Sequence, residues 1–407
     1  MKLLHTADWH LGNTFHGHDR ADEHRHFLNW LQTTVEREKP DALLIAGDVY
    51  DNANPSASAQ ALFYDFLESV TAACPDLQVV VIAGNHDSAS RIEAPSALLE
   101  RHRIFVRGIV GRDAKGNPDY SRLCIPLHGA DGSEVCCLAV PYLRGADCRA
   151  AATQGEAVRA FLAEAVAAAG TRVPLVVVAH FYAVGAEICS DEHSERLVVG
   201  GLDCVDASDL GRGPAYVALG HIHRAQCVAG SDTVRYAGSV LPLSFSERHY
   251  RHGVLRVVLS PDAPAVVDTL EYEPQRGLLS IPAKGAAATA EEVFDEIRRL
   301  PRADKHDDGA CWPYLEIKIR EERPDPSLPR QLLDALADRA VRFCRMERVR
   351  DEKTDASEAL PMASVEGLKR MTPLDMVRQV YRNRYDCDMP ADLVALFEEA
   401  QEKMTEE

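Results

Sequence analysis

The chain has 407 residues, of which 46% are hydrophobic, and its formal net charge at pH 7 is -18. A chain of this length can bury a full core and form more than one domain. The negative charge excludes a protein whose whole surface attracts nucleic acid, because binding to phosphate backbones needs local positive potential. Any contact with DNA must be local or assisted by metal ions.

Up to Pro274, short apolar runs alternate with helical patterns. Most of the runs are β-branched, and they predict buried strands at 3–4, 42–46, 79–83, 175–179 and 215–219. Hydrophobic residues at helical spacing predict a helix between the first and second runs, another between the second and third, and an alanine-rich one before the fourth. This alternation indicates an α/β layered fold, in which strands predominate after His223.

Beyond a domain edge near Pro274, the pattern predicts a small domain, a linker and a helical end. Residues 275–350 follow a β-α-β-α-β order, with strands expected at 278–281, 314–319 and 341–349 and helices at 291–300 and 332–340. Residues 351–371 are charged and turn-rich, which is typical of a linker. Residues 372–407 predict two short amphipathic helices that cannot bury their apolar faces well on each other. We therefore expect a partner to dock there.

The cysteines and the apolar runs also indicate a compartment. Eleven cysteines without a C-x-x-C pair predict neither a disulfide framework nor a zinc ribbon, which favours a reducing environment. The first residues lack the apolar stretch of about 7–15 residues that a secretory signal needs, and no run approaches the ~18 residues of a membrane span. The expected location is cytoplasmic and nucleoid-associated, without membrane contact.

Side chains that can bind metal ions follow the predicted strands. They are Asp8 and His10, Asp48, Asn85, His180, and His221 and His223. Alternate side chains of an extended segment share a face, so Asp8 should pair with His10 and His221 with His223. Carboxylate, amide and imidazole donors together suit manganese, iron or zinc better than calcium. The pattern predicts a two-metal hydrolase with two Mn²⁺ ions, with Fe or Zn as the alternatives.

The same segments predict the catalytic groups. Two cations about 3.5–4 Å apart lower the pKa of a shared water and hold the attacking and leaving oxygens of a phosphoester. Asp48, at the tip of the central strand, is expected to bridge them. His86 follows a ligand directly and should face the substrate as a proton donor or transition-state stabiliser. Asp51 is expected to hold the His86 imidazole in the correct tautomer.

Other histidines have a structural interpretation. His180 alone would be an ambiguous signal, and its place in the series of strand ends is what indicates a ligand. A local cluster consists of His16, His18, His24 and His26. For this cluster a solvated loop and helix face is favoured over a metal site.

With these residues identified, the chain resembles the calcineurin-like metallophosphoesterases, and among them the nuclease subunits that work with an SMC-like ATPase. The similar segments are 4–12, 46–51, 83–88, 140–144, 218–226 and 236–245. The likeness covers the whole catalytic region, and beyond Pro274 it is a similarity of layout. It implies a layered metallophosphoesterase β-sandwich flanked by helices, with a small α+β capping domain and a C-terminal helical pair.

The resemblance also implies roles. It assigns one metal ion to Asp8, His10, Asp48 and His223, the other to Asp48, Asn85, His180 and His221, and the catalytic role to His86. It implies a manganese nuclease that cuts DNA ends and hairpins, as exonuclease and endonuclease. Its C-terminal helices would grip the coiled-coil base of the SMC-like ATPase subunit, as a homodimer within a heterotetramer. As DNA contacts we predict Asn13, Arg91 and Arg224.

Alternatives stay open. A row of arginines, Arg339, Arg342, Arg345, Arg348 and Arg350, would split between the two faces of a strand, and it could be a DNA track or a solvated charged edge. A small-substrate phosphoesterase would use the same metal site, although the C-terminal helices are then hard to explain. A non-catalytic regulatory subunit of the ATPase would explain those helices, although the complete ligand set and His86 argue against it.

Overall fold

The computed structural model describes residues 1–148, 154–170, 172–184, 186, 205–206, 213–261, 263–284, 286–304, 309–321 and 325–349, and isolated positions between 374 and 397. The chain divides into two compact units, Met1–Val349 and Arg350–Glu407. The predicted linker at 351–371 lies outside the described residues, as does most of the predicted helical pair at 372–407. Among the described helices, none has the length and hydrophobicity needed to cross a bilayer.

One six-stranded sheet is built around the first strand, in the order β16-β15-β1-β4-β5-β6. Its strands are β1 (Lys2–Thr6), β4 (Ala42–Ala46), β5 (Gln78–Ile82), β6 (Ile104–Arg107), β15 (His252–Ser260) and β16 (Ala263–Tyr272). Strands β1, β4, β5 and β6 are parallel, whereas β15 and β16 are antiparallel to their neighbours. The carboxyl ends of β1, β4 and β5 therefore lie at the same edge of the sheet.

A second six-stranded sheet has the order β13-β14-β12-β9-β8-β7. Its strands are β7 (Cys124–His128), β8 (Glu134–Val140), β9 (Leu175–His180), β12 (Tyr216–Gly220), β13 (Gln226–Val228) and β14 (Ser231–Tyr236). The four central strands are parallel, and antiparallel β7 and β13 form the edges. Strands β9 and β12 thus also end side by side.

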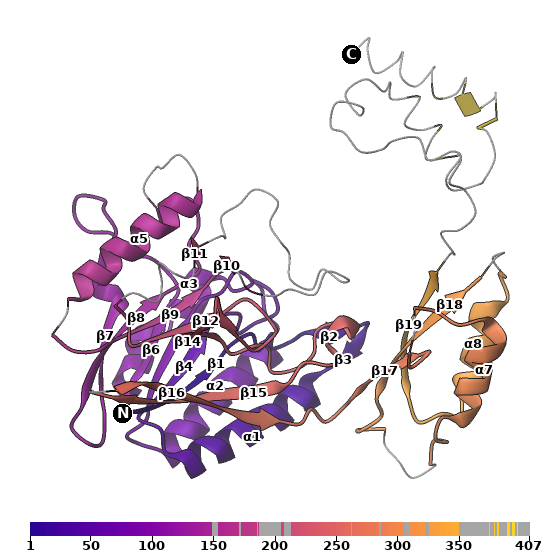
Figure 1. The fold of residues 1–407 in the computed structure, drawn as a ribbon, viewed down its shortest axis with the longest axis horizontal. Coiled ribbons are helices and arrows are strands. Elements are labelled where there is room, and N and C mark those ends of the chain that lie inside the picture. The colour runs from indigo at the N-terminus through magenta and orange to yellow at the C-terminus, as the bar shows by residue number, and fades with distance from the viewer. Residues whose placement is uncertain are drawn as a thin grey trace. The chain divides into compact units, whose positions relative to one another are not determined.

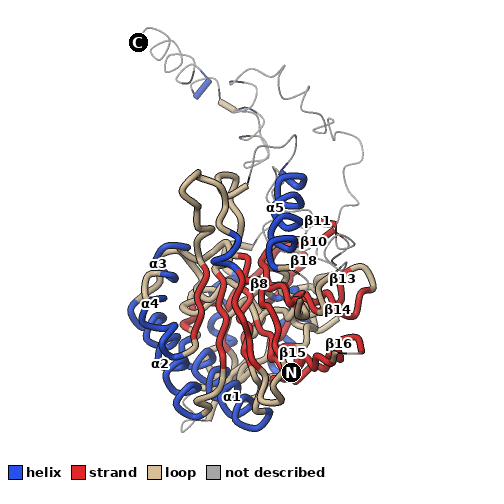
Figure 2. The backbone as a smooth tube through the Cα atoms, turned by 90° about the vertical axis from the view of Figure 1, so that its left-hand side faces the viewer, coloured by secondary structure: helices blue, strands red, loops and turns tan. Residues whose placement is uncertain are grey.

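The two sheets pack face to face between layers of helices. Helices α1 (Ala21–Glu38) and α2 (Ala57–Ala73) cover the outer face of the first sheet, and α5 (Gln154–Ala169) covers that of the second. Figure 1 shows α5 on one side of the strands and α1 and α2 on the other, and Figure 2 shows the same division from the side. Small and β-branched side chains such as Ala218 and Val80 fill the space between the sheets. The predicted α/β layered sandwich is confirmed.

Short elements complete this body. They are α3 (Ala89–Glu93), α4 (Ser96–Leu99), β2 (Thr14–Phe15), β3 (His18–Asp19), β10 (Ala183–Val184), β11 (Val205–Asp206), and single 3₁₀ turns at Glu100–His102, Tyr120–Leu123 and Phe245–Glu247.

The small domain has the predicted β-α-β-α-β order. Its elements are β17 (Leu278–Ile281), α7 (Ala290–Arg299), β18 (Tyr314–Arg320), α8 (Leu328–Leu336) and β19 (Arg342–Val349). The three strands are parallel, and both helices lie on one face of their sheet (Figure 1). Val293 and Leu332 of the helices pack there against Ile317 of the central strand.

The arginines of β19 are engaged within the small domain. The Nη2 atom of Arg345 lies 2.7 Å from the Glu316 carboxylate, and Nε of Arg348 lies 3.0 Å from that of Glu321. Arg342 donates a hydrogen bond to the Gly309 carbonyl at 2.9 Å. Arg342, Arg345 and Arg348 lie on a strand, as predicted, and already have partners, whereas Arg339 precedes β19 and Arg350 lies outside the described residues.

A buried ionic cluster joins the small domain to the body. Glu23 of α1 accepts hydrogen bonds from Arg20 Nε at 3.1 Å and from the Tyr314 hydroxyl of β18 at 2.6 Å. The Nη1 atom of Arg276 lies 3.0 Å from the same carboxylate oxygen. Burial alone would raise the pKa of Glu23, but the Arg20 and Arg276 guanidinium groups hold it below its usual value. Because an unpaired buried ion is costly, the cluster fixes the two domains together.

Replacing Glu23 by Gln should destabilise the chain by roughly 3–5 kcal/mol at neutral pH, since it leaves buried guanidinium groups without their counter-charge. The lowered pKa of Glu23 means that its charge stabilises the folded chain above the usual glutamate pKa and ceases to do so as pH falls through the folded-state pKa. Urea unfolding of both proteins should therefore show a difference that shrinks in acid. Glu271→Gln, at an exposed ion pair, is the control. A difference that does not change with pH would contradict the assignment.

Candidate metal centre

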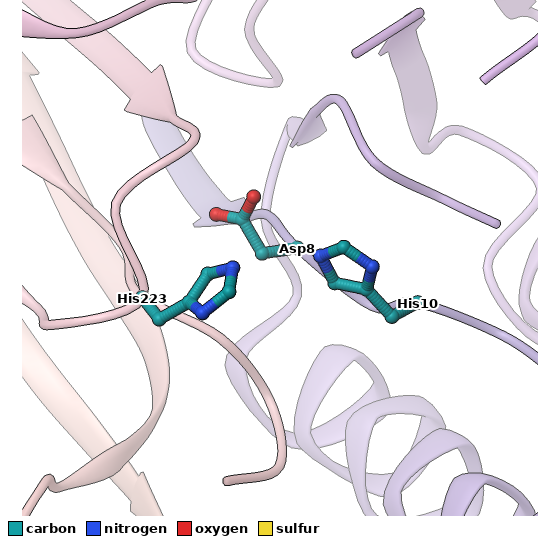
Figure 3. A group of neighbouring side chains, drawn as sticks. All are labelled: Asp8, His10 and His223. Atoms are coloured by element: carbon teal, nitrogen blue, oxygen red, sulfur yellow. The ribbon is translucent and has the colours of Figure 1, made fainter. Parts of the chain in front are cut away.

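The loops that follow the strands bring all the predicted ligands to one place. A first group consists of Asp8, His10 and His223, whose donor atoms lie within 4.8 Å of one another (Figure 3). A second consists of Asp8, Asp48 and His180, within the same limit. Asp8 belongs to both groups, so these side chains surround one continuous pocket between the ends of the two sheets.

Asn85 and His221 complete the second group. The Asn85 amide oxygen lies 3.0 Å from His180 Nε2 and 3.0 Å from His221 Nδ1. His180 Nε2 is also 3.3 Å from an Asp48 carboxylate oxygen. One amide oxygen, one carboxylate and two imidazoles from both sheets therefore face each other.

The backbone that carries these side chains is unusual. Asp8, His10, Asp48 and His221 all have positive φ angles, of 54°, 46°, 49° and 102°. Residues other than glycine rarely adopt such angles, and when they do they cluster at functional sites. Asp8 and His10 do lie close together, as predicted, but not because the chain is extended there. Strand β1 ends at Thr6, and a loop turns both side chains inward.

Hydrogen bonds between loops hold this backbone in place. The amides of Asp8 and His10 donate to the carbonyls of Gly47 and Asp48 at 3.1 and 3.0 Å. The buried carboxylate of Asp87 accepts from the amides of Val49, Tyr50 and Gly84 at 3.2, 2.9 and 2.9 Å. Asp87 thus joins the loops after β4 and β5. The sequence pattern gave it no role, although it stands two positions after Asn85.

Glycines allow the loops to approach closely. A Cβ on Gly84 would lie 2.1 Å from a carboxylate oxygen of Asp48, and one on Gly220 would lie 2.8 Å from His180 Nδ1. Real Cβ atoms do not come so close to other atoms, so only glycine fits at these positions.

Burial and neighbouring charges shift the pKa values of Asp8, Asp48 and His180. Burial raises the pKa of Asp8, against the opposing His180 and His223 imidazoles. Burial would also raise the pKa of Asp48, but His180 and His10 outweigh it and hold that pKa below its usual range. Burial would lower the pKa of His180, but the Asp48 carboxylate raises it to about 9. The surrounding imidazoles therefore favour the charged form of Asp48.

Burial also shifts the pKa values of His221 and Asp87. Burial lowers the pKa of His221 to about 3, which keeps its imidazole neutral and able to bind a metal ion. Burial and the charge of Asp48 raise the pKa of Asp87 to about 6, against its backbone hydrogen bonds.

Hydrogen-bond partners orient the imidazoles of two predicted ligands, His180 and His223. His180 Nδ1 lies 2.8 Å from the Ala46 carbonyl, and His223 Nδ1 lies 3.1 Å from the carboxylate of buried Glu247. Because each acceptor receives a hydrogen bond from Nδ1–H, the proton stays on Nδ1 and Nε2 of each ring is left for the predicted ligand groups. Glu247 was not predicted, since no local motif links it to His223.

His86 lies beside the predicted ligands, and its ring contacts Asp51, the residue predicted to hold it. Its amide donates to Asp48 at 2.9 Å, and its ring centroid is 4.8 Å from that of His10. Its Nδ1 lies 2.8 Å from the main-chain carbonyl of Asp51, not from the carboxylate. That carboxylate instead lies 3.5 Å from His10 Nδ1 and accepts from Asn13 Nδ2 at 2.9 Å. Asp51 therefore contacts the His86 ring through its main chain and not through its carboxylate.

The predicted DNA contacts occupy different environments. Asn13 is half-buried and positions Asp51 through the hydrogen bond to its carboxylate. Arg91 of α3 and Arg224 are both exposed, and they follow the His86 and His223 loops in the sequence.

The cluster of other histidines has mostly structural contacts. His24 is buried, with Nε2 3.1 Å from the Trp9 carbonyl, so a solvated helix face is wrong for this residue. His26 Nδ1 lies 2.7 Å from the Tyr272 hydroxyl, and His18 Nε2 lies 3.0 Å from the Phe343 carbonyl.

The residues of the pocket fit a pair of divalent cations. Both ring nitrogens of His10 are buried without a hydrogen-bond partner among the described residues, although the ring is surrounded by carboxylates. Buried polar atoms in this situation indicate a missing ion or water. The mixture of carboxylate, amide and imidazole donors suits a transition-metal ion. When bound, two such ions lower the pKa of a shared water and stabilise charge on phosphoester oxygens.

Comparison with known proteins agrees with this geometry. The family model described as calcineurin-like phosphoesterase matches residues 1–225. A second model, described as type 5 capsule protein repressor C-terminal domain, matches residues 274–385. Fold and site thus define a calcineurin-like phosphoesterase, a class whose fold implies a dimetal site.

Relatives narrow the class. The chain is 38% identical over 387 residues to the SbcD protein of the nuclease SbcCD from Rhodobacter capsulatus, covering 92% of each chain. It is 29% identical to the protein of the same name from Escherichia coli K12, over 90% of this chain and 91% of the relative. It is 32% identical to the protein of the same name from Bacillus subtilis, over 79% of this chain and 80% of the relative. The chain belongs to the SbcD family, and it is a metal-dependent hydrolase of phosphodiester bonds.

Gly84→Ala should abolish high-affinity Mn²⁺ binding, because the new methyl group would displace the Asp48 carboxylate. Gly277→Ala, where a Cβ meets nothing within 4 Å, is the matched control and should bind as the parent does. Isothermal titration with Mn²⁺ measures the effect, and circular dichroism checks the fold. Unchanged Mn²⁺ affinity in Gly84→Ala would show that Asp48 is not a ligand.

Proposed function

We propose that this chain is the manganese-dependent DNA nuclease subunit of a complex with an SMC-like ATPase. It would act as exonuclease and as endonuclease on DNA ends and hairpins during double-strand-break repair, recombination and replication. One observation carries the proposal: the whole set of predicted ligands, with His86 beside it, converges in a chain that aligns with an SbcD protein over 92% of its length.

The proposed ligand assignment shares Asp48 between the two ions and gives Asp8 to the first ion alone. One ion is assigned to Asp8, His10, Asp48 and His223, and the other to Asp48, Asn85, His180 and His221. The position of the Asp48 carboxylate between His10 and His180, at 3.7 and 3.3 Å, supports its role as the bridge.

His86 is proposed as the group that exchanges a proton with the substrate. Its Nδ1 is held by the Asp51 carbonyl, so Nε2 is the nitrogen left for proton transfer to a leaving oxygen. Its amide bond to Asp48 fixes the loop beside the bridging carboxylate. Asp51 contributes through its carbonyl, and its carboxylate, held by Asn13, supports His10.

DNA binding must then overcome the net charge of -18. Two divalent ions would provide positive potential where the scissile phosphate sits. Arg91, Arg224 and Asn13 are proposed as local contacts. The arginines of β19 already have carboxylate or carbonyl partners, which favours a charged edge over a DNA track.

The domain division supports the partner proposal. We propose 1–274 as the nuclease domain, 275–350 as the capping domain, 351–371 as a linker and 372–407 as the helical segment that binds the ATPase subunit. The relatives from Rhodobacter capsulatus and Escherichia coli are each named as one subunit of SbcCD, which is consistent with a complex. A homodimer within a heterotetramer, working at the nucleoid of the cytoplasm, completes the proposal.

The purified chain with Mn²⁺ should cleave hairpin and single-stranded DNA, and His86→Ala should lower the rate by about 10²–10⁴-fold while leaving Mn²⁺ affinity unchanged. A gel assay of DNA cleavage and isothermal titration give the two measurements. His102→Ala, at an exposed histidine outside the pocket, is the control. Full activity in His86→Ala would refute its role, and turnover of small phosphodiesters alone would favour a small-substrate phosphoesterase.

Deleting the residues after Pro361 should abolish association with the ATPase subunit while Mn²⁺ binding stays intact, because the predicted helical pair is removed and the ligands are not. Size-exclusion chromatography of the mixed subunits measures association. If the shortened chain still co-elutes with the ATPase, the docking proposal fails. If the full chain co-elutes but never cleaves DNA, the regulatory-subunit alternative is favoured.

A further inference from the structure

We infer that Glu247 is a positioning residue for the metal ion at Asp8, His10 and His223, and that docking of the small domain sets the affinity for this ion. The inference rests on the ligand assignment proposed above. It concerns one of the two ions only, so it predicts that the two sites respond differently to the same change.

Glu247 is buried and held by two contacts. The residue is 1% exposed. One carboxylate oxygen lies 3.1 Å from His223 Nδ1, and the other accepts from the Leu243 amide at 2.8 Å. A carboxylate only accepts here, so the proton stays on Nδ1 and Nε2 is the donor atom that faces the ligand group. The ring of His223 then lies 5.4 Å from that of His10, centroid to centroid.

The small domain contacts the residues on both sides of Glu247. The Arg345 guanidinium of β19 lies 5.5 Å from the centroid of the Phe245 ring, and the centroid of the same ring lies 5.2 Å from that of Phe15 of the body. Arg248 Nη1 donates to Ser280 Oγ of β17 at 3.0 Å and lies 3.5 Å from the buried carboxylate of Glu316. The single turn Phe245–Glu247 is therefore held by the small domain at both ends.

A second connection reaches His10 of the same group. The hairpin of β2 and β3 contacts the small domain through Phe15, whose ring centroid is 4.8 Å from that of Tyr314. This hairpin directly follows Asn13, which holds the Asp51 carboxylate 3.5 Å from His10 Nδ1. The small domain thus supports two of the four residues assigned to this ion, His223 and His10.

The other group is supported from within the body. His180 is oriented by the Ala46 carbonyl, and the loop of Asn85 is tied to β4 through Asp87. These contacts do not involve residues of the small domain. Since outer partners of metal ligands typically contribute 10–100-fold to metal affinity, changes at the small domain should alter one affinity and spare the other.

The test is isothermal titration of the full chain with Mn²⁺. Glu247→Gln should weaken one of the two binding events by about 10–100-fold and leave the second unchanged. His10→Ala identifies the affected event as the one that it removes. Glu271→Gln, the same change at an exposed carboxylate, should leave both events as in the parent.

Arg248→Ala tests the contact between the small domain and the turn that carries Glu247. It also keeps the inference testable if Glu247→Gln does not fold. Arg248 is 34% exposed, so its loss should be tolerated, and it should weaken the same event several-fold. Unchanged affinities in both folded variants, or equal weakening of both events, would overturn the inference. If the parent binds two Mn²⁺ ions and only this pattern fails, the ligand assignment stands. If the parent binds no Mn²⁺, the inference and the ligand assignment are both refuted.

Discussion

The burial of two carboxylates in one pocket is the constraint on which the rest of this structure depends. Asp8 and Asp48 are 1% and 2% exposed, and their loops are held together by backbone hydrogen bonds. Removing an ionised carboxylate from water costs several kcal/mol unless positive charge is close. The surrounding imidazoles offset part of this cost, and divalent cations would offset more. The fold therefore favours metal binding by holding the carboxylates where water cannot stabilise them.

Two sheets are needed to maintain this arrangement. The first sheet supplies the carboxylates and Asn85, and the second supplies His180, His221 and His223. Neither set alone encloses an ion. Parallel strands place their carboxyl ends at one edge, and packing of the sheets brings the two edges together. Positive φ angles at the ligands are tolerated because Asp87 and the glycines fix the neighbouring loops.

Much of this could be predicted from sequence, because polar residues at the ends of apolar runs are a local pattern. Strands β1, β4, β5, β9 and β12 and the set of candidate ligands were predicted in this way, whereas the largely buried strand β8 was not. Strands β6 and β7 were missed because they are edge strands and alternate in burial. Whether Asp51 acts through its carbonyl or its carboxylate depends on the path of the loop, which no pattern shows. Glu247 meets His223 only because a turn folds back onto the body.

The small domain has its own consequence for substrate binding. Its buried carboxylate Glu316 and the body's Glu23 collect guanidinium groups from both domains, including Arg345, Arg248 and Arg276. Those cations hold the domains together and are not available to a phosphate backbone. On the proposed function, and in a chain of net charge -18, the positive potential for DNA would then come largely from the metal centre and from a partner. On the proposed function, metal occupancy and DNA binding are therefore coupled, and the domain contact that supports His223 contributes to both.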